Sequence, residues 1–159
     1  MTKEMADSYK LRITQSNASS LLCVAYDMWL CFMDEALEAF KAQSKDDFVL
    51  GLKKVQRVNQ EIINMLNPSN EDSFKMMQIH FYANTIIVKS ILKGEPHDLD
   101  RMKEMVKKLS DAFAEIAKAD TDGPIMQHTQ TVYAGLTYGR GTLNEAMDPM
   151  GSGSRGFTV

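Results

Sequence analysis

Between Leu21 and Met33 the chain is apolar on almost every side of a helix. This stretch, LLCVAYDMWLCFM, contains a single charged residue, Asp27. With the residues that follow, it forms two adjacent apolar stripes, which together are wider than the apolar face of a surface helix. The stripes are Leu21, Ala25, Met28, Phe32 and Ala36, and Leu22, Tyr26, Trp29, Met33 and Leu37. We therefore predict a central helix from Ala18 to about Gln43, capped by Ser16 or Asn17 and covered on most sides by other helices.

Two more helices are predicted downstream. The first begins at a Ser44 cap and ends before Pro68, since the residue before a proline rarely continues a helix. The second begins at a Ser69 or Asn70 cap and ends at Gly94. On the first, the positions at helical spacing are Phe48, Leu52, Val55, Val58 or Asn59, Ile62 and Leu66. On the second, they are Phe74, Met77, Phe81, Thr85, Val88 and Ile91, with a second row at Met76, Ile79, Ala83, Ile86 and Ile87. The later helix is thus apolar over more than one face.

A fourth helix has the simplest pattern in the chain. Its apolar residues step by three and four along one face, and charged residues occupy the opposite face. The apolar residues are Leu99, Met102, Val106, Leu109, Phe113 and Ile116. Because the loops between the predicted helices are short, neighbouring helices must run in opposite directions. The predicted fold is all-α, an antiparallel up-down-up-down four-helix bundle over residues 18–120.

The two ends of the chain differ from this bundle. Residues 1–17 are polar with isolated apolar side chains, which predicts an extended N-terminal arm lying on the bundle. Residues 121–159 hold seven of the nine glycines. We expect a C-terminal extension there, with a short helix over about residues 124–135 followed by a flexible tail. The GSGS at residues 151–154 is either a native segment or an artificial linker.

Composition and charge exclude several classes of partner. The chain has 159 residues, enough for one well-cored domain, and a net charge of -3 with no dense run of Lys and Arg. It lacks the electrostatic signature of a protein that binds nucleic acid or acidic membranes. The N-terminal MTKEMADSYK has no apolar signal-peptide core, and no segment is long enough to span a bilayer. We expect a cytoplasmic protein without membrane insertion.

Candidate catalytic and metal-binding groups are scattered along the chain. Cys23 and Cys31 are eight residues apart, about 12 Å along a helix, which is too far for a disulfide and predicts buried thiols. His80, His97 and His128 belong to no Glu-x-x-His pair, so ordinary polar histidines are expected. Sequence motifs of nucleotide-binding, hydrolytic and zinc-dependent enzymes are absent. We therefore expect no enzymatic activity, no cofactor and no metal site.

The remaining features favour binding. Asp27 has no second carboxylate or histidine nearby at helical spacing, so we expect a paired or rim-exposed structural side chain rather than an acid-base group. Two of the predicted helices have more apolar face than one core needs, and 12 residues are Met. Methionine is adaptable and suits grooves that accept apolar helices, although it also fills cores. This pattern favours a protein that holds a partner's apolar helix.

Four short motifs, in order along residues 9–116, resemble those of the flagellin-specific export chaperones, the FliS family. Ile13–Ala18 occupies the place of the family's V-x-T-A-S-P, Leu21 matches the Leu that follows it, and Ala25-Tyr26-Asp27 matches the family's L-Y-D. Lys54–Ile62 is similar to the family's K-A-Q-x-I-I-x-E-L. On the third predicted helix, Tyr82, Ile87 and Ser90 occupy the places of a Tyr, a Leu and an Ala in the family. On the fourth, Leu109, Ala112 and Phe113 occupy the places of the Leu, Ala and Trp of the family's L-R-x-A-W. Gln15 and Ala18 depart from the family's Thr and Pro, and Phe113 replaces its Trp.

The resemblance implies a cytoplasmic chaperone that binds the C-terminal segment of flagellin. Such a chaperone prevents premature polymerisation and assists delivery to the flagellar type III export apparatus. The resemblance leaves open whether other flagellar export or regulatory proteins also bind, and whether the chain forms a homo-oligomer. The alternative is a non-enzymatic four-helix regulatory or adaptor module that binds another amphipathic helix or self-associates through its first helix.

The resemblance also suggests where cargo binds. We expect a groove on the second and third helices, with the N-terminal arm as a movable cap. The expected groove residues are Val55, Val58, Ile62, Ile79, Tyr82 and Ile86, and the expected cap residues are Tyr9 and Ile13. Plain core packing is the alternative for each of them. In the C-terminal extension, Tyr133, Leu136 and Tyr138 are expected to dock on the bundle or on a neighbouring copy and to compete with cargo.

Overall fold

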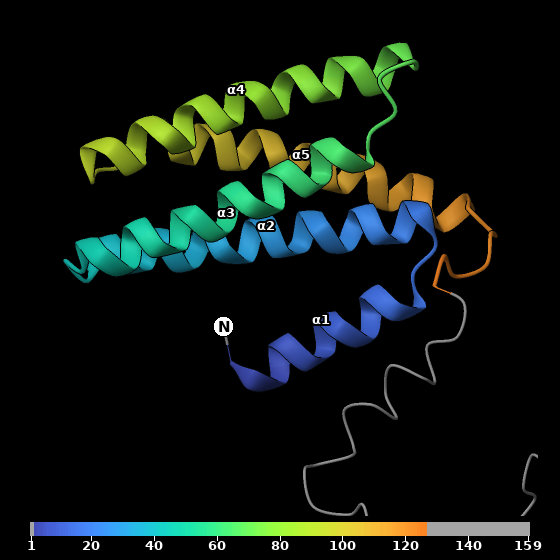
Figure 1. Cartoon of the computed structure of the whole chain (residues 1–159), viewed down its shortest axis with the longest axis horizontal. Helices are drawn as coiled ribbons and strands as arrows, with labels where there is room; N and C mark the ends of the chain where they lie inside the picture. Colours follow the sequence, from blue (N-terminus) through green and yellow to red (C-terminus); the bar gives the residue numbers. More distant parts are fainter. Residues whose placement is uncertain (1, 127–159) are drawn as a thin grey trace, which may run out of the picture. The chain divides into compact units, whose positions relative to one another are not determined.

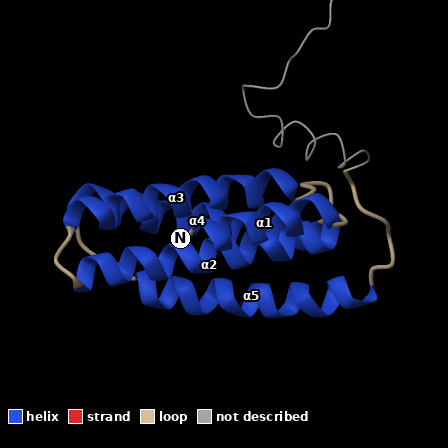
Figure 2. Cartoon of the chain, turned by 90° about the horizontal axis from the view of Figure 1, so that it is seen from below, coloured by secondary structure: helices blue, strands red, loops and turns tan. Residues whose placement is uncertain are grey.

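The computed structural model describes residues 2–126, and the regular secondary structure of this part is all helix, without strands (Figures 1 and 2). Its five helices are α1 Lys3–Gln15, α2 Ala18–Lys41, α3 Lys45–Met65, α4 Glu71–Lys93 and α5 Leu99–Ala119. The predicted all-α class is confirmed. Within the described part, no helix is both long and apolar enough to cross a membrane.

Helix α2 lies at the centre of the fold, as its double stripe predicts. It packs against α1, α3 and α5, while α4 packs against α3 and α5. The buried residues of α2 are Leu22, Val24, Ala25, Tyr26, Trp29, Phe32, Met33 and Ala36. On the α5 side, the Tyr26 ring stacks on Phe113 with the ring centroids 5.6 Å apart. The central helix is therefore covered from three directions.

The predicted helix boundaries agree closely with the structure, and local side chains explain them. Asn17 caps α2 by accepting a hydrogen bond from the backbone of Ser20, and Asn70 caps α4 in the same way. Gly94 ends α4 with a φ of 66°, a left-handed conformation that favours glycine. Ser44 precedes α3 but makes no such cap, and its hydroxyl donates to the Asp47 carboxylate at 2.6 Å.

The expectation of an extended N-terminal arm is wrong, since this segment is helix α1. Thr2 caps the helix by accepting a hydrogen bond from the Met5 backbone at 3.3 Å. Lys3–Gln15 contains no glycine or proline to interrupt a helix. Tyr9 and Ile13 are four residues apart, so they share one face of the helix. This four-residue spacing was the feature of the sequence that indicated a helix here.

After α5 the chain is irregular. Residues 120–126 form no helix, so the predicted helix does not begin at Pro124. The remainder of that predicted helix, the tail and His128 lie outside the described residues.

Helices α2 and α3 approach each other closely where Gly51 faces Ala36. A Cβ atom on Gly51 would lie 2.8 Å from the Ala36 Cβ and 3.0 Å from its Cα, far inside normal contact. Glycine is therefore required in the middle of α3, although it is a poor helix former. The Ala36 side chain and its backbone fix this spacing.

Replacing Gly51 with alanine should consequently destabilise the protein. In an open helix the change would stabilise by up to about 1 kcal/mol, whereas here overpacking should lower the free energy of unfolding by about 2 kcal/mol. Urea denaturation measures this. Gly123→Ala is the matched control, because nothing lies within 4 Å of its added Cβ. A Gly51→Ala variant as stable as that control would contradict the close packing.

Candidate functional site

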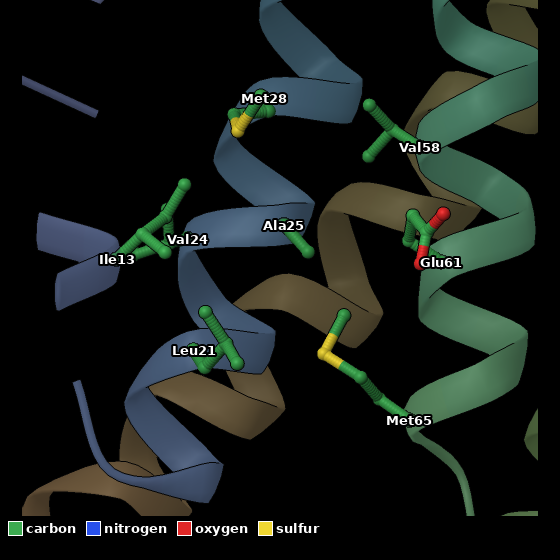
Figure 3. Close-up of a pocket in the computed structure, with 8 residues that line it drawn as sticks. All are labelled: Ile13, Leu21, Val24, Ala25, Met28, Val58, Glu61 and Met65. Atoms are coloured by element: carbon green, nitrogen blue, oxygen red, sulfur yellow. The ribbon is translucent and has the colours of Figure 1, made fainter. Parts of the chain in front are cut away.

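An apolar groove lies among α1, α2 and α3 (Figure 3). Its cavity volume is about 310 Å³. The residues that line it are Ile13, Leu21, Val24, Ala25, Met28, Val58, Glu61 and Met65. Glu61 is the only charged residue among them, so the groove can bury apolar side chains but offers little for polar recognition.

The groove follows from the surplus apolar width of α2. Leu21, Ala25 and Met28 belong to one of the two predicted stripes. The rest of that stripe, Phe32 and Ala36, lies in the core with Tyr26 and Trp29 of the other stripe. From α3, Val58 and Met65 are seven residues apart and therefore face the same side. Val58 is buried whereas Met65 is 38% exposed, so the groove opens toward this end of α3.

Helix α1 lies over this groove but is held only by surface contacts. None of its residues is buried. Ile13 lines the groove, and the Arg12 guanidinium donates to the Asp27 carboxylate at 2.6 Å. The two side chains of this ion pair are 44% and 42% exposed, and such pairs contribute about 1 kcal/mol or less. Helix α1 is therefore attached weakly compared with the four other helices.

A second α1 contact joins Tyr9 to Cys31. The two groups lie close enough for each to affect the pKa of the other. Burial raises the pKa of the Tyr9 hydroxyl and that of the Cys31 thiol, so both groups are neutral at physiological pH. Arg12 also lies over the Tyr9 ring, 5.7 Å from its centroid.

Two smaller predictions on this face can be compared with the structure. Asp27 is confirmed as a paired, partly exposed structural carboxylate. Cys23 and Cys31 are free thiols, but they are half-buried rather than buried. The reason is that their side of α2 faces the loosely packed α1 instead of the core. Burial raises the pKa of Cys23 as well, which keeps this thiol protonated.

The junction between α1 and α2 is held by the segment that follows α5. The Ile125 backbone donates to the Ser16 carbonyl at 3.0 Å, and Asn17 donates to the Asp122 carbonyl at 3.1 Å. Ser19 donates to the Asp120 carboxylate at 2.5 Å and thereby lowers the pKa of that group. These bonds tie the segment after α5 to the junction between α1 and α2.

The predicted site residues fall into three places. Ile13 and Val58 meet in the groove, and Tyr9 lies on α1 beside it. In the core lie Val55, Ile62 and Ile86. On α4 lie Ile79, which is half-buried, and Tyr82, which is exposed. The groove thus brings together only part of the predicted set.

Sequence reasoning missed most of the groove. The missed residues are Leu21, Val24, Ala25, Met28, Glu61 and Met65. A signal was available for Leu21, Ala25 and Met28, because two adjacent apolar stripes are wider than one core contact needs, whereas Val24 belongs to neither stripe. For Met65 the signal was its position seven residues after Val58, which places it at the edge of the apolar stripe of α3.

A buried polar network joins α2, α3 and α4 behind the groove. Asn59 donates to the His80 carbonyl at 3.0 Å, which leaves its own amide oxygen to accept from the His80 Nδ1, 2.8 Å away. His80 Nε2 therefore accepts from the Tyr26 hydroxyl at 3.0 Å. Burial lowers the pKa of His80 to about 4 and raises that of Tyr26. His80 is confirmed as a neutral, hydrogen-bonded core histidine.

Metal-binding chemistry has no candidate in the described part. Over residues 2–126, no three His, Cys, Asp or Glu side chains come together as a metal ion would require. The residues of the groove are themselves almost entirely apolar.

An all-helical fold with an apolar groove is typical of proteins that bind a partner's amphipathic helix. The comparisons identify the family. The model of the flagellar protein FliS matches residues 1–120, so the chain belongs to the FliS family. This is a family of flagellar export chaperones rather than of enzymes. The match includes α1 as well as the other four helices. A comparison with individual curated proteins finds no match.

Proposed function

We propose that the groove among α1, α2 and α3 binds the C-terminal segment of flagellin as an amphipathic helix. The protein then prevents premature polymerisation of flagellin in the cytoplasm and assists its delivery to the type III export apparatus. The observation that carries this proposal is an apolar groove covered by a helix with no buried residue. Flagellin's terminal segments are amphipathic and assembly-prone, so an apolar groove can hold them without chemistry.

In this proposal α1 is a displaceable cover. The cargo helix inserts apolar side chains where Ile13 lies, and α1 swings away about its anchored junction. Displacement breaks the Arg12–Asp27 ion pair and separates Tyr9 from Cys31, both at the surface. Since a longer apolar helix buries more area than Ile13 alone, the exchange favours cargo.

We further infer that α2 to α5 run in the up-down-up-down order over residues 18–120. Three short connections support it, and the colour gradient of Figure 1 follows the chain through them. They are residues 42–44, 66–70 and 94–98. Connections this short join antiparallel neighbours.

Calorimetric titration tests the function. The full chain is titrated with a C-terminal flagellin fragment from the same organism. We expect binding of one fragment per chaperone with a negative heat-capacity change, which is the signature of apolar burial. Absence of binding would contradict the proposal and favour an adaptor that binds a different helix.

Weakening the attachment of α1 should strengthen cargo binding. Arg12→Glu replaces the ion pair with Asp27 by a repulsion, so less free energy is needed to displace α1. We expect flagellin to bind about fivefold more tightly, which corresponds to a contact worth about 1 kcal/mol. The same titration measures the change.

Lys10→Glu is the matched control. It makes the same change of charge on the same helix, but Lys10 pairs with Asp7 within α1 instead of with α2. If Arg12→Glu binds flagellin no more tightly than Lys10→Glu does, the cover mechanism is wrong.

A further inference from the structure

Helix α4 exposes apolar side chains on a face remote from the groove. Phe74, Phe81 and Leu92 are 49%, 52% and 81% exposed. Phe74, Phe81 and Val88 repeat every seven residues, so they form one stripe with Leu92 close to the same line. Figure 1 shows α4 and α1 at opposite edges of the fold. The α4 stripe is therefore separate from the candidate cargo groove, although Glu61 of α3 lines both that groove and the polar groove between α3 and α4.

Beyond the first turn of α4, which contains Glu71 and Asp72 next to Phe74, the surroundings of the stripe are basic, although the whole chain has a net charge of -3. From Ser73 to Lys93 in α4, and from Phe48 to Gln60 in α3, the sequence contains no Asp or Glu. The cations in these two segments are Lys53, Lys54, Arg57, Lys75, Lys89 and Lys93. Such a separation of charge on a mildly acidic protein points to an acidic partner.

Most of these cations have no partner within the described part of the chain. Lys54 pairs with Glu35 at 3.8 Å and Lys75 with Glu71 at 2.8 Å. Among residues 2–126, no ion pair involves the other four, which are Lys53, Arg57, Lys89 and Lys93. Their charge is thus available to another molecule.

A polar groove between α3 and α4 places two of these cations beside the stripe. Its lining residues are Lys53, Gln56, Arg57, Gln60, Glu61 and Asn84. Gln56 donates to Asn84 at 3.1 Å, which links the two helices across the groove. Glu61 is the only acidic residue in it. Guanidinium, ammonium and amide groups here can donate hydrogen bonds to carboxylates.

We propose that this α4 face, meaning Phe74, Phe81 and Leu92 flanked by Lys53 and Arg57, docks an acidic amphipathic helix of a second protein. The seven-residue repeat matches the spacing with which one helix packs on another. A neutral partner would leave the basic flank without a function.

The chain's own C-terminal segment suits this surface less well. Residues 127–159 contain two arginines, Arg140 and Arg155, and two acidic residues, Glu145 and Asp148, so their charges cancel. The proposal does not depend on which cargo the α1 groove binds, and it predicts that both surfaces can be occupied together.

The test uses two synthetic helical peptides of about three heptads. Both present leucines at the same seven-residue repeat, and they differ only in flanking residues, Glu in one and Lys in the other. Fluorescence anisotropy measures their binding to the full chain. We expect the acidic peptide to bind at least about tenfold more tightly, and to weaken when salt is raised from about 0.05 M to about 0.5 M.

Two surface variants locate the binding. The first is the double variant Lys53→Glu/Arg57→Glu, and the second is Phe81→Ser/Leu92→Ser. Each should weaken binding of the acidic peptide by about tenfold or more. The matched control is Lys107→Glu/Lys108→Glu, which reverses two exposed charges on α5 and should have little effect. All of these positions are exposed, so circular dichroism should show unchanged helix content.

Several outcomes would overturn the proposal. Equal binding of both peptides would mean non-specific apolar contact. If the Met65→Asp variant no longer bound the acidic peptide, the binding site would be the α1 groove instead. Binding to phosphatidylserine vesicles without binding to the peptide would assign the face to a membrane surface. Dimerisation of the free chain, abolished by Phe81→Ser, would assign the face to a second copy.

Discussion

Acidification from about pH 7 to about pH 4 is expected to lower the free energy of unfolding by about 3 kcal/mol through His80 alone. Burial lowers the pKa of His80 to about 4 in the folded protein, against an ordinary value of 6.5. Between these two values the unfolded chain binds a proton that the folded chain does not. Stability is therefore full above the unfolded pKa and is lost as the pH falls toward the folded one.

Urea denaturation at several pH values between these limits measures the effect. His80→Gln should be less stable than the original protein at neutral pH, because the bonds to Asn59 and Tyr26 are disturbed. Its stability should nevertheless depend less steeply on pH. If His80→Gln keeps the full slope, another group controls acid unfolding.

The largest effect on cargo binding is expected from Met65→Asp. This side chain lines the groove and is 38% exposed, so the fold should tolerate the change. With cargo bound, the carboxylate would lie against apolar side chains and lose its hydration. We expect flagellin binding to weaken about thirtyfold, which is about 2 kcal/mol.

Asn64→Asp provides the control for charge and helix position. Asn64 is exposed, lies next to Met65 in the last turn of α3, and accepts a hydrogen bond from Gln60 at 3.1 Å, which an aspartate can also accept. Both variants add one negative charge near a helix C-terminus, where it is mildly unfavourable. Only the Met65 variant places that charge in the groove. Equal affinities of the two variants would show that the groove does not contact cargo.

Much of the fold could be predicted from periodicity. The double stripe of α2 predicted a helix covered on several sides, and Asn17, Asn70 and Gly94 predicted helix ends that the structure confirms. These features are local, since a cap or a stripe depends on residues within one or two turns. The same local signals reproduced four of the five helices of the described part.

Helix α1 was missed because its stability is not local. Its apolar residues are few, and what holds it are contacts with α2 from residues such as Arg12 and Ile13. Helical propensity alone is a weak signal in a short polar segment. The spacing of Tyr9 and Ile13 was informative only once α2 was known to have a free face.

The candidate site was predicted less well than the fold. Val55, Ile62 and Ile86 follow the same periodic pattern as groove residues, but they are buried in the core. Periodicity says that a helix face is covered, and it does not say by what. Telling the core from a binding groove requires the packing of α1 and α3 around α2, which only the structure provides.

Methionine methyl NMR on the full chain tests the central claim most directly. Met28 and Met65 line the groove, Met76 and Met77 lie on α4, and Met102 is buried in the core. On addition of the flagellin C-terminal fragment, we expect the Met28 and Met65 methyl signals to shift and to show intermolecular NOEs, while Met102 stays unchanged. Shifts confined to Met76 and Met77 would place cargo on α4 and contradict the account.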